Sequence, residues 1–110
     1  MKAWLVVLSE QAKADILDIH DYIAFELLSP ESASKLTSKI VEATDELAIF
    51  PKKYPLCRFS KQKEKGHRAM SVGRQRIFYK ILEEIGVIMV TGVLYEGRNA
   101  AKIFSQDSFT

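Results

Sequence analysis

The apolar residues of this chain change their spacing at Pro51. Before Pro51 they recur mainly three and four residues apart, which places them on one side of a helix. After it they fall into short runs rich in β-branched residues, which is typical of strands. A chain with these two periodicities in succession is expected to adopt an α+β fold, in which helices cover one face of a mainly antiparallel sheet.

Two helices are expected before Pro51. The first follows Ser9, a residue type that caps helix N-termini, and its apolar stripe ends at Leu27. The second begins at Ser29-Pro30-Glu31, where a cap, a proline and an acid suit the first turn, and it continues to Phe50. Because the link between them is short, the two helices are expected to form an antiparallel hairpin.

The other regular segments are predicted to be strands. Residues 3–8 are a short apolar run that predicts a buried N-terminal strand. Three further strands, joined by short turns as an antiparallel meander, are expected at residues 68–72, 76–82 and 87–95. Residues 52–66, interrupted by Pro55 and Gly66, predict a loop. We expect a single domain over residues 1–110.

Charge is segregated along the chain. Ten of its sixteen Lys and Arg residues lie between Pro51 and Lys80, where Glu64 is the only acid. The first fifty residues hold nine acids and four bases, so the formal net charge of +2 averages a basic segment and an acidic one. Such a separation can attract a polyanion or an acidic protein segment.

Composition excludes several classes of protein. The single cysteine, Cys57, rules out an internal disulfide framework and fits a reducing compartment. The apolar run at residues 3–8 is too short to span a membrane, and we expect a cytoplasmic protein. His20 lacks the i, i+4 partner of a helical metal site, and we expect neither a metal nor another cofactor.

Four segments stand in order along the chain: Leu8-Ser9 with the first helical stripe, Phe50-Pro51 with Tyr54-Pro55, the block from Arg68 to Ile81, and the ending from Val93 to Asn99. Together they resemble the RelE/ParE superfamily of type II toxins, over residues 3–103. The resemblance implies a small bacterial toxin with a strand, a helical hairpin and a three-stranded meander. It also implies a cognate antitoxin that holds the toxin inactive.

The superfamily has two branches with different activities. ParE-like members poison DNA gyrase by protein contact, whereas RelE-like members cut mRNA at the ribosome. The long hairpin and the ending Tyr95-Glu96-Gly97-Arg98-Asn99 resemble the ParE-like branch. Where RelE-like enzymes often carry a tyrosine or histidine near the C-terminus, this chain has Phe104, which exchanges no proton. The resemblance therefore favours gyrase inhibition, with an mRNA interferase as the alternative.

The resemblance also implies which residues are functional. In the interferase alternative, the catalytic candidates are His67, Arg68, Arg76 and Arg98. Arginine suits the scissile phosphate because its planar fork matches phosphate oxygens and stays protonated. The candidates for binding the target or the antitoxin are Arg68, Arg74, Arg76, Tyr95, Arg98 and Asn99. The wrapping segment of the antitoxin is expected to be acidic, and the complex to be hetero-oligomeric.

Two further interpretations stay open. The strand arginines also fit a solvated sheet face without function, and His67 beside Gly66 fits an ordinary turn residue. A basic nucleic-acid-binding domain without toxin activity is the second alternative to gyrase inhibition. It predicts binding to naked DNA or RNA that weakens steeply as salt is raised.

Overall fold

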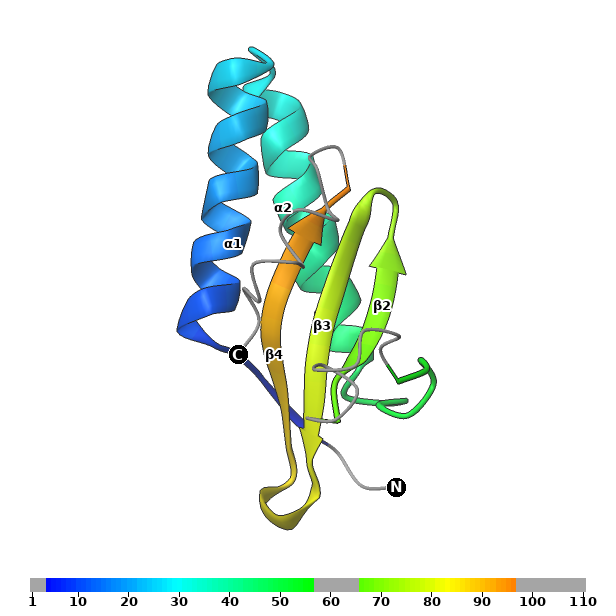
Figure 1. Ribbon diagram of the computed structural model, residues 1–110. Coiled ribbons are helices and arrows are strands. Elements are labelled where there is room, and N and C mark those ends of the chain that lie inside the picture. The colour runs from blue at the N-terminus through cyan, green and yellow to red at the C-terminus, as the bar shows by residue number, and fades with distance from the viewer. Residues whose placement is uncertain (1–3, 57–65, 97–110) are drawn as a thin grey trace.

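The computed structural model describes residues 4–56 and 66–96 (Figure 1). The elements are, in chain order, β1 (Leu5–Leu8), α1 (Glu10–Asp21), the π-helix η1 (Tyr22–Glu26), α2 (Pro30–Glu46), β2 (Arg68–Val72), β3 (Gln75–Leu82), the 3-10 helix η2 (Glu83–Ile85) and β4 (Val87–Tyr95). This order of strand, two helices and three strands is the predicted one. No helix in these two ranges is long and apolar enough to cross a membrane.

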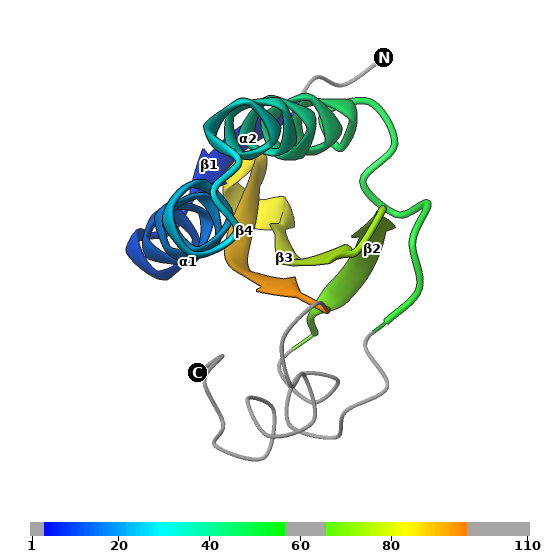
Figure 2. The same cartoon turned by 90° about the horizontal axis from the view of Figure 1, so that it is seen from above.

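The four strands form one mixed sheet in the order β1-β4-β3-β2. β2, β3 and β4 are antiparallel neighbours, which confirms the predicted meander. β1 pairs in parallel with β4, from Leu5 opposite Val87 to Leu8 opposite Val90. Both helices cover the same face of the sheet, which confirms the α+β class (Figure 2).

The helical hairpin turns through an unusual backbone. The α-helix predicted up to Leu27 ends at Asp21, and the wider π-helix η1 continues it. At the end of η1, Leu27 N donates to Tyr22 O at 3.1 Å. Leu28 follows with φ +54°, the left-handed conformation that favours glycine. As a result Leu27, which was expected on the buried stripe, is exposed.

Helix α2 ends at Glu46, short of the predicted end at Phe50. Residues 47–49 form a turn whose backbone N–H groups donate to carbonyls three residues back. Leu47 stays buried in the core, but Ile49 and Phe50 are exposed. The last part of the predicted apolar stripe therefore lies on the surface.

The core lies between the hairpin and the sheet (Figure 2). Tyr79 of β3 is fully buried in it, and its hydroxyl donates to the Pro51 carbonyl at 2.7 Å. Burial raises the pKa of the Tyr79 phenol to about 12, because the phenolate would lose its hydration. This hydrogen bond holds the segment that follows α2 against the sheet.

Strand β4 carries a bulge in its middle. Tyr79 of β3 pairs with Val90, but Phe78 pairs with Gly92, so Thr91 has no residue opposite it. Side chains alternate between the two faces of a regular strand, and an extra residue reverses that alternation. The residues of β4 that face the helices are therefore even-numbered before Thr91 and odd-numbered after it.

Helix α1 binds the backbone groups beside this bulge. The Ser9 hydroxyl donates to the Thr91 carbonyl at 3.2 Å, and the Asp15 carboxylate accepts from Val93 N at 2.9 Å. Burial raises the pKa of the Asp15 carboxyl, although the hydrogen bonds from Val93 and Gln11 act in the opposite direction. Helix α1 thus lies along the edge of β4 beyond the point where β1 ends.

Candidate partner-binding groove

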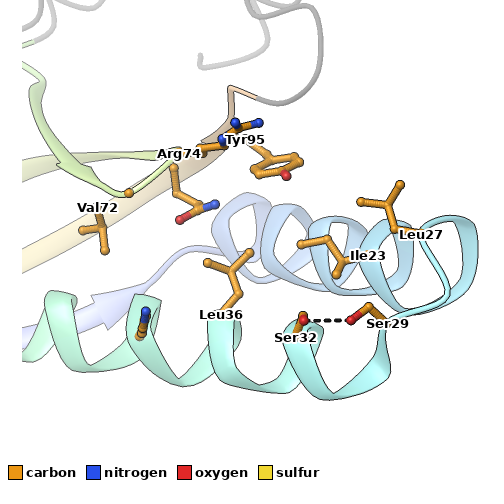
Figure 3. Close-up of a pocket in the computed structure, with 11 residues that line it drawn as sticks. Ile23, Leu27, Ser29, Ser32, Leu36, Val72, Arg74 and Tyr95 are labelled. Carbon is orange, nitrogen blue, oxygen red and sulfur yellow. Dashed lines mark hydrogen bonds between the residues drawn. The ribbon is translucent and has the colours of Figure 1, made fainter.

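A groove of about 520 Å³ lies where the helical hairpin meets one end of the sheet (Figure 3). Its lining comes from η1, the start of α2, the β2–β3 turn and the end of β4: Ile23, Leu27, Ser29, Ser32, Leu36, Lys39, Val72, Gly73, Arg74, Gln75 and Tyr95. The structure therefore brings together Arg74 and Tyr95, two of the residues that were predicted to bind a partner.

The floor of the groove is apolar. Leu36 of α2 and Tyr95 of β4 point toward one another across it (Figure 3). The Tyr95 ring packs on Tyr22 of η1, with the ring centroids 6.1 Å apart and the planes tilted by 56°. This tilted arrangement is one that aromatic pairs prefer, and it holds the Tyr95 ring in place. A bulky apolar side chain of a partner would be removed from water here.

A buried amide faces this floor. Gln75 opens β3 beside the groove, and only 4% of its surface is exposed. Gln75 therefore adds a polar side chain to the lining of the groove.

Two cations flank the floor, Lys39 on α2 and Arg74 in the β2–β3 turn. In the described part of the chain neither forms an ion pair. At the start of α2, the Ser29 hydroxyl donates to the Ser32 hydroxyl oxygen at 2.7 Å. An apolar floor flanked by Lys39 and Arg74 is complementary to an acidic peptide with an apolar side.

Arg68 lies on the helix-covered face of the sheet. It opens β2 opposite Tyr79, and its guanidinium Nη1 donates to the Tyr54 carbonyl at 2.6 Å. Its charge also lowers the pKa of the Tyr79 phenol, against the larger rise caused by burial. Arg68 therefore connects the segment around Tyr54 to the sheet.

Arg76 lies on the opposite face. Because side chains alternate along β3, Arg76 points away from the side that Tyr79 and the paired Arg68 share. Its Nη2 is 2.8 Å from Glu96 Oε1, in a half-exposed ion pair. The sheet thus separates the two arginines that were predicted for one nuclease site.

Of the other residues named for a nuclease site, the structure describes only His67. His67 is buried directly before β2. Arg98, Asn99 and Phe104 lie outside the described residues. In the described part of the chain, no group of three His, Cys, Asp or Glu side chains is placed to hold a metal ion.

Several groove residues have no clear signal in the sequence. Leu36 belongs to the apolar stripe of α2, and its spacing does not distinguish a groove wall from the core. Gln75 and Lys39 are equally unremarkable as polar residues of a strand and a helix. The available signal is Leu27-Leu28, an apolar pair directly before Ser29-Pro30, where a helical hairpin turn usually carries polar residues or glycine.

Comparisons with known proteins agree with this architecture. The family described as ParE toxin of type II toxin-antitoxin system, parDE, matches residues 6–100. Among solved structures, the chromosomal ParDE TA system from P. aeruginosa aligns with a TM-score of 0.72 at 17% identity, covering 86% of this chain and 98% of that one. The toxin-antitoxin complex RelBE2 from Mycobacterium tuberculosis aligns with a TM-score of 0.65 at 16% identity, covering 84% and 98%. No protein of curated function matches the chain.

At these identities the two solved structures show a shared fold, and the family match identifies the chain. That match begins within β1 and extends past the end of β4, so it includes every helix and all but the first residue of the sheet. It also confirms the RelE/ParE resemblance of the sequence. The chain belongs to the family of ParE toxins of type II toxin-antitoxin systems.

Proposed function

We propose that this toxin arrests growth by binding DNA gyrase in the cytoplasm, and that it does not cut mRNA. The observation that carries the proposal is the separation of Arg68 from Arg76 by the sheet, with His67 buried. A metal-free ribonuclease must activate a hydroxyl, stabilise the phosphorane and protonate the leaving oxygen at one place. Protein contact needs no such convergence.

The half-exposed ion pair of Arg76 with Glu96 fits a role in protein contact. A paired arginine on an open sheet face can exchange its partner for a carboxylate of another protein at little cost, because exposed ion pairs contribute only about 0–1 kcal/mol. Arg98 and Asn99 come shortly after Glu96 in the sequence, and we propose that they belong to the same contact surface.

The antitoxin is proposed to bind the groove. An acidic segment would place an apolar side chain against Leu36 and Tyr95, and its carboxylates beside Lys39 and Arg74. Gln75 also lines the groove and would lie beside that segment. Such segments commonly become ordered on binding, which allows a small toxin to be covered over a large surface.

Expression and gyrase assays test the toxin activity. The chain is induced from a tight promoter with and without the small open reading frame that adjoins its gene, and the purified toxin is added to gyrase supercoiling and cleavage reactions. We expect growth arrest that the neighbouring protein relieves, together with inhibited supercoiling at micromolar toxin. Cleaved mRNA at the ribosomal A site with unaffected gyrase would establish the interferase alternative instead.

Charge reversals test the groove. Lys39→Glu and Arg74→Glu are expected to weaken antitoxin binding by about tenfold each, or about 1.4 kcal/mol. Lys35→Glu, an exposed lysine on α2 that does not line the groove, is the matched control and should leave the affinity unchanged. Affinity for the antitoxin is measured by calorimetric titration. If Lys39→Glu and Arg74→Glu bind it as tightly as the unchanged chain does, the antitoxin binds elsewhere.

A further inference from the structure

A second hollow, of about 550 Å³, lies beyond the C-terminal end of α2. It is lined by Trp4, Ile49, Phe50, Pro51, Lys52 and Lys53, which we call the Phe50 patch. The groove described above begins at the other end of α2, and the two sites share no residue. Neither the gyrase proposal nor the antitoxin proposal uses this patch.

Large apolar side chains of the Phe50 patch are exposed. Ile49 is 56% and Phe50 is 64% exposed, although Leu47 in the same turn is buried in the core. The cause is the early end of α2 at Glu46, because the turn that follows directs these side chains outward. Neighbouring exposed apolar residues in a hollow are typical of an interaction site.

The backbone under the Phe50 patch is held in place from several sides. Pro51 is buried, and its carbonyl accepts the buried hydroxyl of Tyr79 at 2.7 Å. Lys53 N donates to the Phe50 carbonyl at 3.2 Å. Lys52 Nζ lies 2.9 Å from Glu83 Oε1 of η2. The apolar side chains are therefore presented by an ordered frame, which lowers the entropy lost when a partner binds.

The rim of the patch is basic. Lys52 forms an ion pair with Glu83. Lys53 forms none in the described part of the chain, and its Nζ lies 5.5 Å from the centroid of the Tyr54 ring. No acid lines the hollow itself. An apolar floor with lysines on its rim is complementary to a segment that combines carboxylates with one bulky apolar residue.

We propose that the Phe50 patch is a docking site for an acidic segment of a partner protein, which inserts one bulky apolar side chain beside Trp4 and Phe50. The carboxylates of that segment pair with Lys53 and, at the edge, with Lys52. Two lysines are few for a nucleic acid backbone, whose binding usually draws on several phosphate contacts. Apolar burial contributes most of the affinity, and the lysines set the orientation and the preference for acids.

Trp4 is the only tryptophan of the chain, so its fluorescence reports on this patch. The probe is a short peptide of Asp and Glu residues around a central Leu-Phe pair, without tryptophan. We expect a saturable change in Trp4 emission. A peptide with Ser in place of the Leu-Phe pair, and one with Lys in place of the acids, should each bind at least about tenfold more weakly.

Two pairs of variants locate the binding. Phe50→Ser should weaken peptide binding by about tenfold or more, whereas Phe25→Ser, at a residue 70% exposed outside the patch, should not. Lys53→Glu should weaken it, whereas the exposed Lys35→Glu should not. Thermal unfolding of each variant confirms that it is folded before its affinity is compared.

Several results would overturn the proposal. They are a Trp4 signal that never saturates, equal binding by Phe50→Ser and the unchanged chain, or equal binding of the acidic and basic peptides. A single-stranded oligonucleotide that changes Trp4 emission at lower concentration than the peptide would assign the patch to nucleic acid. A peptide-free signal that varies with protein concentration, with dimers in sedimentation, would assign it to a second copy of the chain.

Discussion

The carboxylate of Asp15 in α1 accepts a hydrogen bond from the backbone N–H of Val93 in β4, at 2.9 Å, across a sequence separation of 78. This bond lies next to the bulge at Thr91, where β4 has already passed the end of β1. A helix side chain therefore satisfies a strand backbone group that no neighbouring strand reaches on this edge.

Replacing Asp15 should distinguish the contribution of its hydrogen bond to stability from the contribution of its charge. Asp15→Ala leaves Val93 N without its acceptor and should lower the free energy of unfolding by about 1–3 kcal/mol. Asp15→Asn keeps an oxygen that can accept the same bond, and should cost clearly less. Urea unfolding of both variants measures the difference, and equal losses would show that the charge matters more than the hydrogen bond.

The Asp15 carboxyl also predicts a pH dependence. Its pKa is raised in the folded state, chiefly by burial, so the folded chain holds this proton at higher pH than the unfolded chain does. The contribution of this group to the free energy of unfolding should therefore fall as pH rises from about 4 through its folded pKa. Asp15→Asn lacks this component, and the difference between the two unfolding curves over the acidic range reports it.

Tyr79→Phe should loosen the segment after α2. The variant removes the hydroxyl that the Pro51 carbonyl accepts, and should cost about 0.5–1.5 kcal/mol. Because the phenol pKa is raised to about 12, the stability linked to its proton is complete below about pH 10 and is lost as pH rises toward 12. Alkaline unfolding followed by circular dichroism should show this loss in the unchanged chain and not in Tyr79→Phe.

Leu28→Gly should stabilise the hairpin. Leu28 has φ +54° and is 82% exposed, so glycine removes backbone strain and little buried surface. We expect the free energy of unfolding to rise by up to about 1 kcal/mol. Leu27→Gly, at a residue with φ −92°, should lower it and is the matched control. A drop for Leu28→Gly would mean that the Leu28 side chain contributes more than its exposure indicates.

Arg76→Ala should retain most of the growth arrest if the toxin acts on gyrase, because a broad protein surface tolerates the loss of one half-exposed contact. The lost ion pair with Glu96 is half-exposed and worth about 0–1 kcal/mol, so the variant should stay folded. Induced cultures are followed by optical density, and ribosomal mRNA by primer extension. Loss of arrest together with A-site cleavage by the unchanged toxin would support the interferase alternative.

The order of helices and strands was predictable because it depends on the local spacing of apolar residues and on the caps, prolines and glycines that begin or end each segment. The parallel pairing of β1 with β4 was not, since nothing in residues 3–8 specifies which strand they will join. Helix ends were also imprecise. The apolar spacing continues to Leu27 and Phe50, but the backbone departs from α geometry before each of them.

The candidate site was predictable in part. Arg74 and Tyr95 do line the groove, whereas Gln75 enters it only through the hairpin register that places it opposite Val72. The separation of Arg68 from Arg76 depends on the same register, which pairs Arg68 with Tyr79. Side-chain alternation alone cannot fix the relative faces of two strands until that pairing is known.

The parallel pairing of the first strand with the last has a consequence for synthesis. Val87–Tyr95 lies between β1 and β3, and among the strands that the structure describes it is the last to leave the ribosome. Until it emerges, β1 has no neighbour and the hairpin has only part of a sheet to cover. A nascent chain therefore lacks the central pairing of this sheet until residues 87–95 have been translated, and a message broken before the codon of Val87 encodes none of β4.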